Sequence, residues 1–165
     1  MAWDIKPLIG LGPLAFGMSP AAVAGASTQL GAVTARNTDQ DGTINEYRRL
    51  EDPNVSYRAD GLIFIATTWR VKDVLWNGVD VYAAPPLDVL RTLETANGGA
   101  AQMFGVVVFD RLCLQLSGFY VFERSQPYDP HGEEQDDRGL TVWERVAHED
   151  TMSKFAQHVH SVSFI

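Results

Sequence analysis

The residues with the clearest chemical potential are the carboxylates gathered in residues 125–139. This segment also holds prolines and glycines and has no apolar periodicity, so we expect a long loop that buries little. Paired carboxylates on a loop are a poor platform for positioned acid–base catalysis, whereas they suit electrostatic attraction to a basic partner. The predicted partner-binding residues are Tyr128, Asp129, Glu133, Glu134, Asp136 and Asp137.

The histidines and the single cysteine are weaker candidates. His158 and His160 lie two residues apart and would share one face of a strand, but a zinc site needs further ligands that this spacing does not supply. Cys113 alternates with leucines in a predicted strand, and no histidine lies close in the sequence to activate it as a nucleophile. We therefore expect no catalytic residues, no metal and no cofactor.

Residues 31–42 have the composition of a polar connection. Asp39-Gln40-Asp41-Gly42 begins like an EF-hand calcium loop, which requires a glutamate at its twelfth position. Counted from Asp39, that position is Leu50, so a solvated turn is favoured over a calcium site.

These candidates must be positioned by the elements around them, and the clearest local signal lies in residues 12–23. A short apolar strand ends at Phe16, and Gly17 frees the backbone to turn. Ser19 then stands where a helix N-cap belongs, with Pro20 at the first helical position, where its missing N–H costs nothing. We therefore expect a strand, a tight turn and a short helix.

The same pattern returns later in the chain, where Tyr82 takes the place of Phe16 and Pro86 that of Pro20. Three extended runs follow each predicted helix, joined by turn dipeptides such as Asp60-Gly61. The predicted strands are residues 43–50, 55–59 and 62–67 in the first half, and residues 102–109, 112–116 and 119–123 in the second. Recurrence of this kind indicates a duplicated unit.

The predicted fold is α+β, with two pseudo-repeats that each consist of a short helix and an antiparallel β-meander. The helices are expected to pack on one side of an antiparallel sheet, and the Asn77-Gly78 dipeptide to join a hairpin of residues 74–76 and 79–82. All 165 residues form one domain in this prediction. Its parts are repeat one (8–68), repeat two (74–124) and a C-terminal loop–strand–helix–strand extension (125–165). In this extension a strand is predicted at residues 140–146 and a short helix at residues 149–157.

Residues 16–23, Phe-Gly-Met-Ser-Pro-Ala-Ala-Val, resemble the F-G-M-S/T-x-x-x-V motif of a broad group of small α+β domains. The group includes BamE-like outer-membrane assembly lipoproteins, the tandem-repeat beta-lactamase inhibitory protein and many bacterial immunity proteins that neutralise a cognate toxin. The second copy departs from the motif, with Tyr-Ala-Ala-Pro at residues 82–85. A BamE-like lipoprotein needs a lipidated cysteine at its mature N-terminus, whereas the cysteine here is Cys113, so the resemblance favours the inhibitors.

Composition limits the kinds of partner. The net charge of −8 argues against direct binding to nucleic acid, which relies on neutralising phosphates, and favours a basic protein partner. No apolar run approaches the roughly 20 residues that cross a bilayer. The first residues lack the basic and apolar regions of a signal peptide. We therefore expect no membrane association and a cytoplasmic location.

The leading hypothesis is a non-catalytic protein-binding inhibitor, most concretely an immunity protein that occludes the active site of a cognate bacterial toxin. Many toxins that act on nucleic acids or nucleotides have basic clefts. Residues 125–139, the acidic segment, could occupy such a cleft as a phosphate mimic. Two alternatives stay open at this point. One is a structural or assembly domain of BamE-like type, and the other is an enzyme whose site assembles only in three dimensions.

Overall fold

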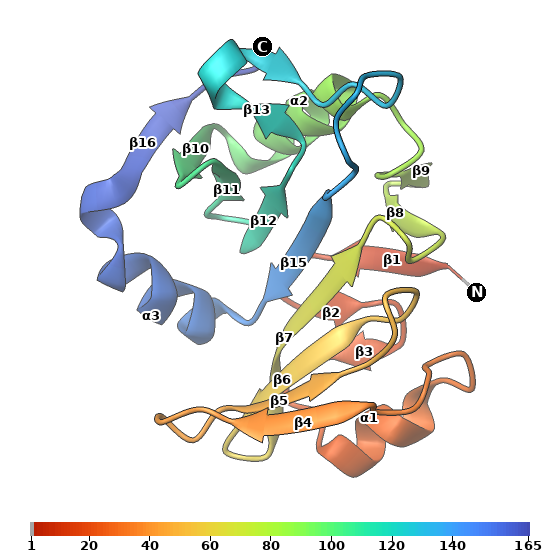
Figure 1. Cartoon of the computed structure of the whole chain (residues 1–165). Helices are drawn as coiled ribbons and strands as arrows, with labels where there is room; N and C mark the ends of the chain where they lie inside the picture. Colours follow the sequence, from red (N-terminus) through yellow and green to blue (C-terminus); the bar gives the residue numbers. More distant parts are fainter. Residues whose placement is uncertain (1) are drawn as a thin grey trace.

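A nine-stranded antiparallel sheet forms the centre of the fold (Figure 1). The computed structural model, which describes residues 2–165, orders its strands β16-β10-β11-β12-β15-β7-β6-β5-β4. They span Ala35–Thr38 (β4), Ile44–Tyr47 (β5), Asn54–Arg58 (β6), Gly61–Thr68 (β7), Ala100–Met103 (β10), Val106–Phe109 (β11), Leu114–Ser117 (β12), Gly139–Trp143 (β15) and Val159–Val162 (β16). Near its middle, β7 pairs with β15, which places Ile65 opposite Val142, and both side chains are fully buried.

A second, five-stranded sheet joins the N-terminal strands to the middle of the chain, in the order β3-β2-β1-β8-β9. Its strands are Trp3–Lys6 (β1), Gly10–Leu11 (β2), Leu14–Ala15 (β3), Val74–Trp76 (β8) and Val79–Asp80 (β9). The predicted Asn77-Gly78 hairpin between β8 and β9 is confirmed, and both turn residues have the positive φ that such turns require.

Helices α1 (Pro20–Ala26) and α2 (Pro86–Asn97) cover one face of the large sheet. Val23 of α1 and Leu90 of α2 belong to the same hydrophobic core as Leu114 and Leu116 of β12. The third helix, α3 (Arg145–Lys154), contacts Gln115, which lies between these two leucines and therefore faces the other side. The two helices predicted to pack on one side, α1 and α2, thus contribute to one core, whereas α3, which belongs to the C-terminal extension, lies on the opposite face.

The turn before α1 has the predicted chemistry. Ser19 caps the helix by accepting a hydrogen bond from the N–H of Ala22, and Pro20 is the first helical residue. Gly17 has a φ of +91°, and its N–H donates to the carbonyl of Leu62 in β7. The turn therefore ties the start of α1 to the central sheet.

Replacing Gly17 with valine is expected to lower the free energy of unfolding by about 1–3 kcal/mol, because a β-branched residue strains this conformation. A Cβ at Gly17 would meet nothing within 4 Å, so the cost comes from the backbone alone. Urea unfolding measures it. The control, Gly25→Ala inside α1, also meets nothing within 4 Å and should stabilise the protein by about 0.4–1 kcal/mol. An unchanged midpoint for Gly17→Val would show that the turn is not strained.

The predicted strands of the first half, residues 43–50, 55–59 and 62–67, correspond to β5, β6 and β7. Before them, part of the polar connection forms β4, whose residues are all exposed. This strand carries no apolar periodicity because it lies at the sheet edge and is held by backbone pairing with β5.

The second half departs further from its prediction. Residues 102–109 do not form one strand: Phe104 and Gly105, both with positive φ, turn the chain between β10 and β11. Residues 119–123 do not join the large sheet either. Phe119 fills the core beside Tyr82, and Tyr120–Val121 (β13) pairs with Gln126–Pro127 (β14) in a separate hairpin around the short helix Phe122–Arg124 (η1). In the sheet, β15 lies next to β12 instead.

The C-terminal extension has the predicted order of loop, strand, helix and strand. The helix was expected at residues 149–157, but α3 begins at Arg145, because Glu144 caps it by accepting hydrogen bonds from two backbone N–H groups. A short 3₁₀ helix, Ala156–His158 (η2), then leads into β16. Within residues 2–165, no helix combines the length and the apolar character that crossing a membrane requires.

Candidate functional site

Arg138 anchors the acidic segment to the core. Its side chain is only 6% exposed, and its guanidinium carbon lies 4.6 Å from the centre of the Tyr128 ring and 5.5 Å from that of Phe119. The guanidinium donates two hydrogen bonds to the carboxylate of Asp136, from Nε at 3.1 Å and from Nη2 at 2.9 Å. This bidentate ion pair, whose guanidinium stacks on aromatic rings, fixes the C-terminal end of the acidic segment.

Two of the predicted partner-binding residues, Tyr128 and Asp136, thus help to hold the segment in place. Burial, reinforced by the negative charge of Asp136, raises the pKa of Tyr128. Burial alone would raise the pKa of Asp136 as well, but the hydrogen bonds from Arg138 outweigh it and hold the pKa of that carboxyl below its ordinary value. The expectation that the segment buries little is therefore wrong, because a buried cation and an aromatic ring anchor it.

The other four predicted residues lie at the surface. Asp129, Glu133 and Asp137 are exposed. Glu134 is partly exposed and forms an ion pair with Arg124 of η1. The anchored segment therefore presents carboxylates to solvent from a fixed base.

A pocket of about 310 Å³ opens between β13 and η1 on one side and the acidic segment on the other. It is lined by Gly118, Tyr120, Val121, Glu123, Tyr128, Glu134, Gln135 and Asp137. Carboxylates accept hydrogen bonds from ammonium and guanidinium groups, and tyrosine rings attract cations. We call this the acidic pocket, and its chemistry suits a lysine or arginine side chain.

The sequence prediction missed Glu123 and Tyr120 as parts of this pocket. Both precede the acidic segment, on η1 and β13, and no spacing rule connects them to it. The pairing of β13 with β14 brings them to the pocket. Only the charge of Glu123, just before the segment, offered a sequence signal.

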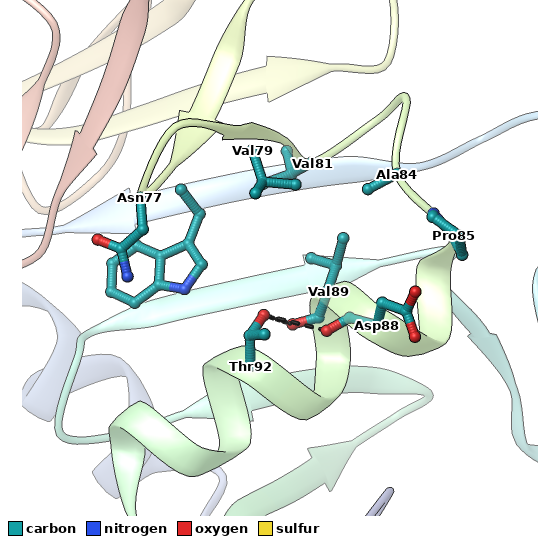
Figure 2. Close-up of a pocket in the computed structure, with 9 residues that line it drawn as sticks. Asn77, Val79, Val81, Ala84, Pro85, Asp88, Val89 and Thr92 are labelled. Carbon is teal, nitrogen blue, oxygen red and sulfur yellow. Dashed lines mark hydrogen bonds between the residues drawn. The ribbon is translucent and has the colours of Figure 1, made fainter.

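A second pocket, of about 340 Å³, lies between the β8–β9 hairpin and α2 (Figure 2). Its lining is formed by Trp76, Asn77, Val79, Val81, Ala84, Pro85, Asp88, Val89 and Thr92. Figure 2 shows Val79, Val81 and Ala84 on the hairpin side, opposite Val89 and Thr92 on the helix. We call this the apolar pocket; it was not predicted from the sequence.

Asp110 lies close to two further chemically capable side chains, His148 and Cys113, whose thiol donates to the Asp110 carbonyl. Cys113 has a positive φ in the turn before β12, so the prediction that it lies within a strand is wrong. His148 is fully buried, with its Nδ1 3.5 Å from a carboxylate oxygen of Asp110. Burial lowers the pKa of His148 and raises that of the Cys113 thiol to about 11. A thiol that stays protonated at neutral pH is a weak nucleophile, so this group does not have the properties of an activated cysteine.

Cys113 should react slowly with thiol reagents at pH 8. Raising its pKa from 9.0 to about 11 lowers the thiolate fraction about a hundredfold, and burial blocks access besides. Timed alkylation with iodoacetamide, followed by mass spectrometry, measures the rate. The urea-unfolded chain should react at least a hundredfold faster than the folded protein. Equal rates would show that the thiol is exposed and ionised.

The paired histidines do not occur as expected. His160 lies on β16, but His158 ends η2, so the two do not share a strand face. The ring of His158 lies 4.7 Å from that of Phe104. Residues 2–165 contain no cluster of three or more histidine, cysteine, aspartate or glutamate side chains arranged to hold a metal ion.

Comparison with known proteins adds no relative to this picture. No protein-family pattern, curated protein or solved structure gives a significant match to the chain.

Proposed function

We propose that this protein is a non-catalytic inhibitor, an immunity protein that neutralises a cognate bacterial toxin in the cytoplasm by occluding its active site. The acidic pocket is the observation that carries the proposal. It places the carboxylates of Glu123, Asp137 and Glu134, the last paired with Arg124, beside the rings of Tyr120 and Tyr128. Glu134, Asp137 and Tyr128 lie on the acidic segment, whose C-terminal end is fixed by Arg138. A basic side chain at the edge of a toxin's cleft would find both a charge partner and an aromatic surface there.

The anchoring of the acidic segment supports this function on energetic grounds. A mobile loop loses conformational entropy when it binds, whereas a loop already held in place loses less. The exposed carboxylates of Asp129, Glu133 and Asp137 add to the net charge of −8 and would accelerate encounter with a basic surface. Pre-organisation favours a long-lived complex, and charge favours rapid association.

We further infer that the scaffold is a duplicated unit, with β15 as the fourth strand of the second copy. In this arrangement α1 precedes the meander β4-β5-β6-β7, and α2 precedes β10-β11-β12 and then β15. Each helix begins with a proline, Pro20 or Pro86. The last strands of the two copies, β7 and β15, pair with each other in antiparallel fashion. The acidic segment is then an insertion between the third and fourth strands of the second copy.

A growth assay tests the proposed function. The reading frame next to the gene for this protein is expressed in a bacterial host, alone and together with this protein. We expect growth to stop in the first case and to continue in the second. A toxic neighbour whose effect persists in the presence of soluble, folded inhibitor would contradict the proposal.

A further inference from the structure

The apolar pocket contains one charged side chain, Asp88, whose carboxylate is exposed and has no partner in the part of the chain that the structure describes. Among its nine lining residues, Asp88 is the only ionisable one. No other group within residues 2–165 forms a hydrogen bond or an ion pair with the Asp88 carboxylate. Figure 2 shows Asp88 on the α2 side of the pocket, beside Val89 and below Pro85.

On the α2 side of the pocket, the other polar side chain, Thr92, already forms hydrogen bonds within the helix. The Thr92 hydroxyl lies 3.0 Å from the backbone carbonyl oxygens of both Asp88 and Val89 and donates to them (Figure 2). A ligand would therefore meet mainly apolar side chains, together with the exposed carboxylate of Asp88 and the polar side-chain groups of Asn77 and Trp76 on the hairpin side.

The start of α2 does not favour an anion in this pocket. Anions bind helix N-termini through free N–H groups, but Pro85 and Pro86 have none. The N–H groups of Asp88 and Val89 both donate to the carbonyl of Pro85. The first turn of α2 thus has few N–H groups left to bind an anion, and the negative charge of Asp88 also opposes an anionic ligand.

One cation lies nearby. Arg91 lines a neighbouring pocket that shares Trp76, Asn77 and Thr92 with the apolar pocket. Its Nε donates to the carbonyl of Phe164 at 2.7 Å, which holds the guanidinium toward the C-terminus of the chain. Arg91 is therefore not a lining residue of the apolar pocket and does not neutralise Asp88.

We propose that the apolar pocket binds a small organic ammonium ion with an apolar body. The volume of about 340 Å³ falls in the range of small-molecule sites. The apolar body would pack against the partly exposed Trp76 and the exposed Val79, with the buried Val81 and Val89 also lining the pocket. The ammonium group would remain near the mouth beside Asp88. A charge half in solvent avoids the large cost of full burial while keeping its carboxylate partner. The site is separate from the acidic pocket, so it does not depend on the proposed function.

Titration with a matched series of compounds tests the proposal. The probes are 4-phenylbutylamine, 4-phenylbutan-1-ol and 4-phenylbutyrate, which differ in charge at one end. Methyl signals of Val79, Val81 and Val89 in ¹H–¹³C NMR spectra report binding at the site. We expect saturable shifts with the amine, an affinity at least threefold lower for the alcohol, and the weakest binding for the carboxylate.

Variants separate the role of charge from that of shape. Asp88→Asn should make the amine and the alcohol bind equally, whereas Asp39→Asn, in the distant β4–β5 turn, should leave the preference intact. Ala84→Phe should fill the pocket and abolish all shifts, with an unchanged circular dichroism spectrum as the check on folding. Absence of shifts at the three valines, or equal binding of amine and alcohol to the native protein, would overturn the proposal.

Discussion

Arg138→Met is expected to lower the free energy of unfolding by about 3 kcal/mol, because it leaves the largely buried carboxylate of Asp136 without its partner. The side chain of Asp136 is only 16% exposed and accepts both guanidinium hydrogen bonds. The substitution also removes the cation stacked on Tyr128 and Phe119. Urea unfolding followed by tryptophan fluorescence measures the loss.

The cost of this substitution should depend on pH. The pKa of Asp136 is 3.8 in the unfolded chain and lower in the folded protein. The ion pair therefore contributes its full stabilisation of the fold above pH 3.8, and this contribution is lost as the pH falls toward the folded pKa. The difference in stability between the native protein and Arg138→Met should therefore shrink below about pH 3.8. A difference that stays constant down to pH 2 would show that packing, not the charge pair, stabilises this region.

A double variant is the matched control for the ion pair. Asp136→Leu combined with Arg138→Met removes both charges and leaves no buried ion unpaired. It should be at least 1 kcal/mol more stable than the sum of the two single losses would predict. Additive losses would mean that Arg138 and Asp136 act independently.

Neutralising the exposed carboxylates of the acidic segment is expected to slow association with the proposed toxin partner about tenfold at low salt, with little change in dissociation. The variant carries Glu133→Gln, Glu134→Gln and Asp137→Asn and keeps Asp136, whose role is in the fold. Exposed charges contribute about 0.2–1 kcal/mol each, so single substitutions should have small effects. Stopped-flow measurements across a salt series should show the difference shrinking as salt screens the charges.

The control for this variant removes three negative charges elsewhere. Asp39→Asn, Asp60→Asn and Glu149→Gln lie in the β4–β5 turn, the β6–β7 turn and α3, far from the acidic segment in Figure 1. Because the two variants change the net charge equally, they separate local attraction from overall charge. Equal association rates for the two variants would show that the acidic segment has no special part in encounter.

Local sequence signals predicted those parts of the fold in which neighbouring residues determine the conformation. Ser19 and Pro20 marked the start of α1, and Asn77-Gly78 marked the β8–β9 hairpin, because capping and turn chemistry act over a few residues. The edge strand β4 escaped prediction, because its exposed side chains leave no periodic pattern and pairing with β5 supplies its stability.

Such local signals could not predict which strands pair with each other in the large sheet. Residues 119–123 and 140–146 were both predicted as strands, and only packing in three dimensions decides that β15 lies between β12 and β7. The same limit applied to the candidate site. Tyr128 was predicted as a partner-binding residue beside the carboxylates, but stacking on Arg138, ten residues away, buries it.

Inhibition kinetics test the central claim most directly, since occlusion of an active site makes a specific prediction about substrate. Initial rates of the purified product of the neighbouring reading frame are measured at several substrate concentrations while this protein is titrated in. The proposed function predicts competitive inhibition, complete near a one-to-one ratio, with an apparent inhibition constant that rises linearly with substrate. An activity that does not respond to the protein, or inhibition of equal strength at every substrate concentration, would contradict the claim that this protein occludes the active site.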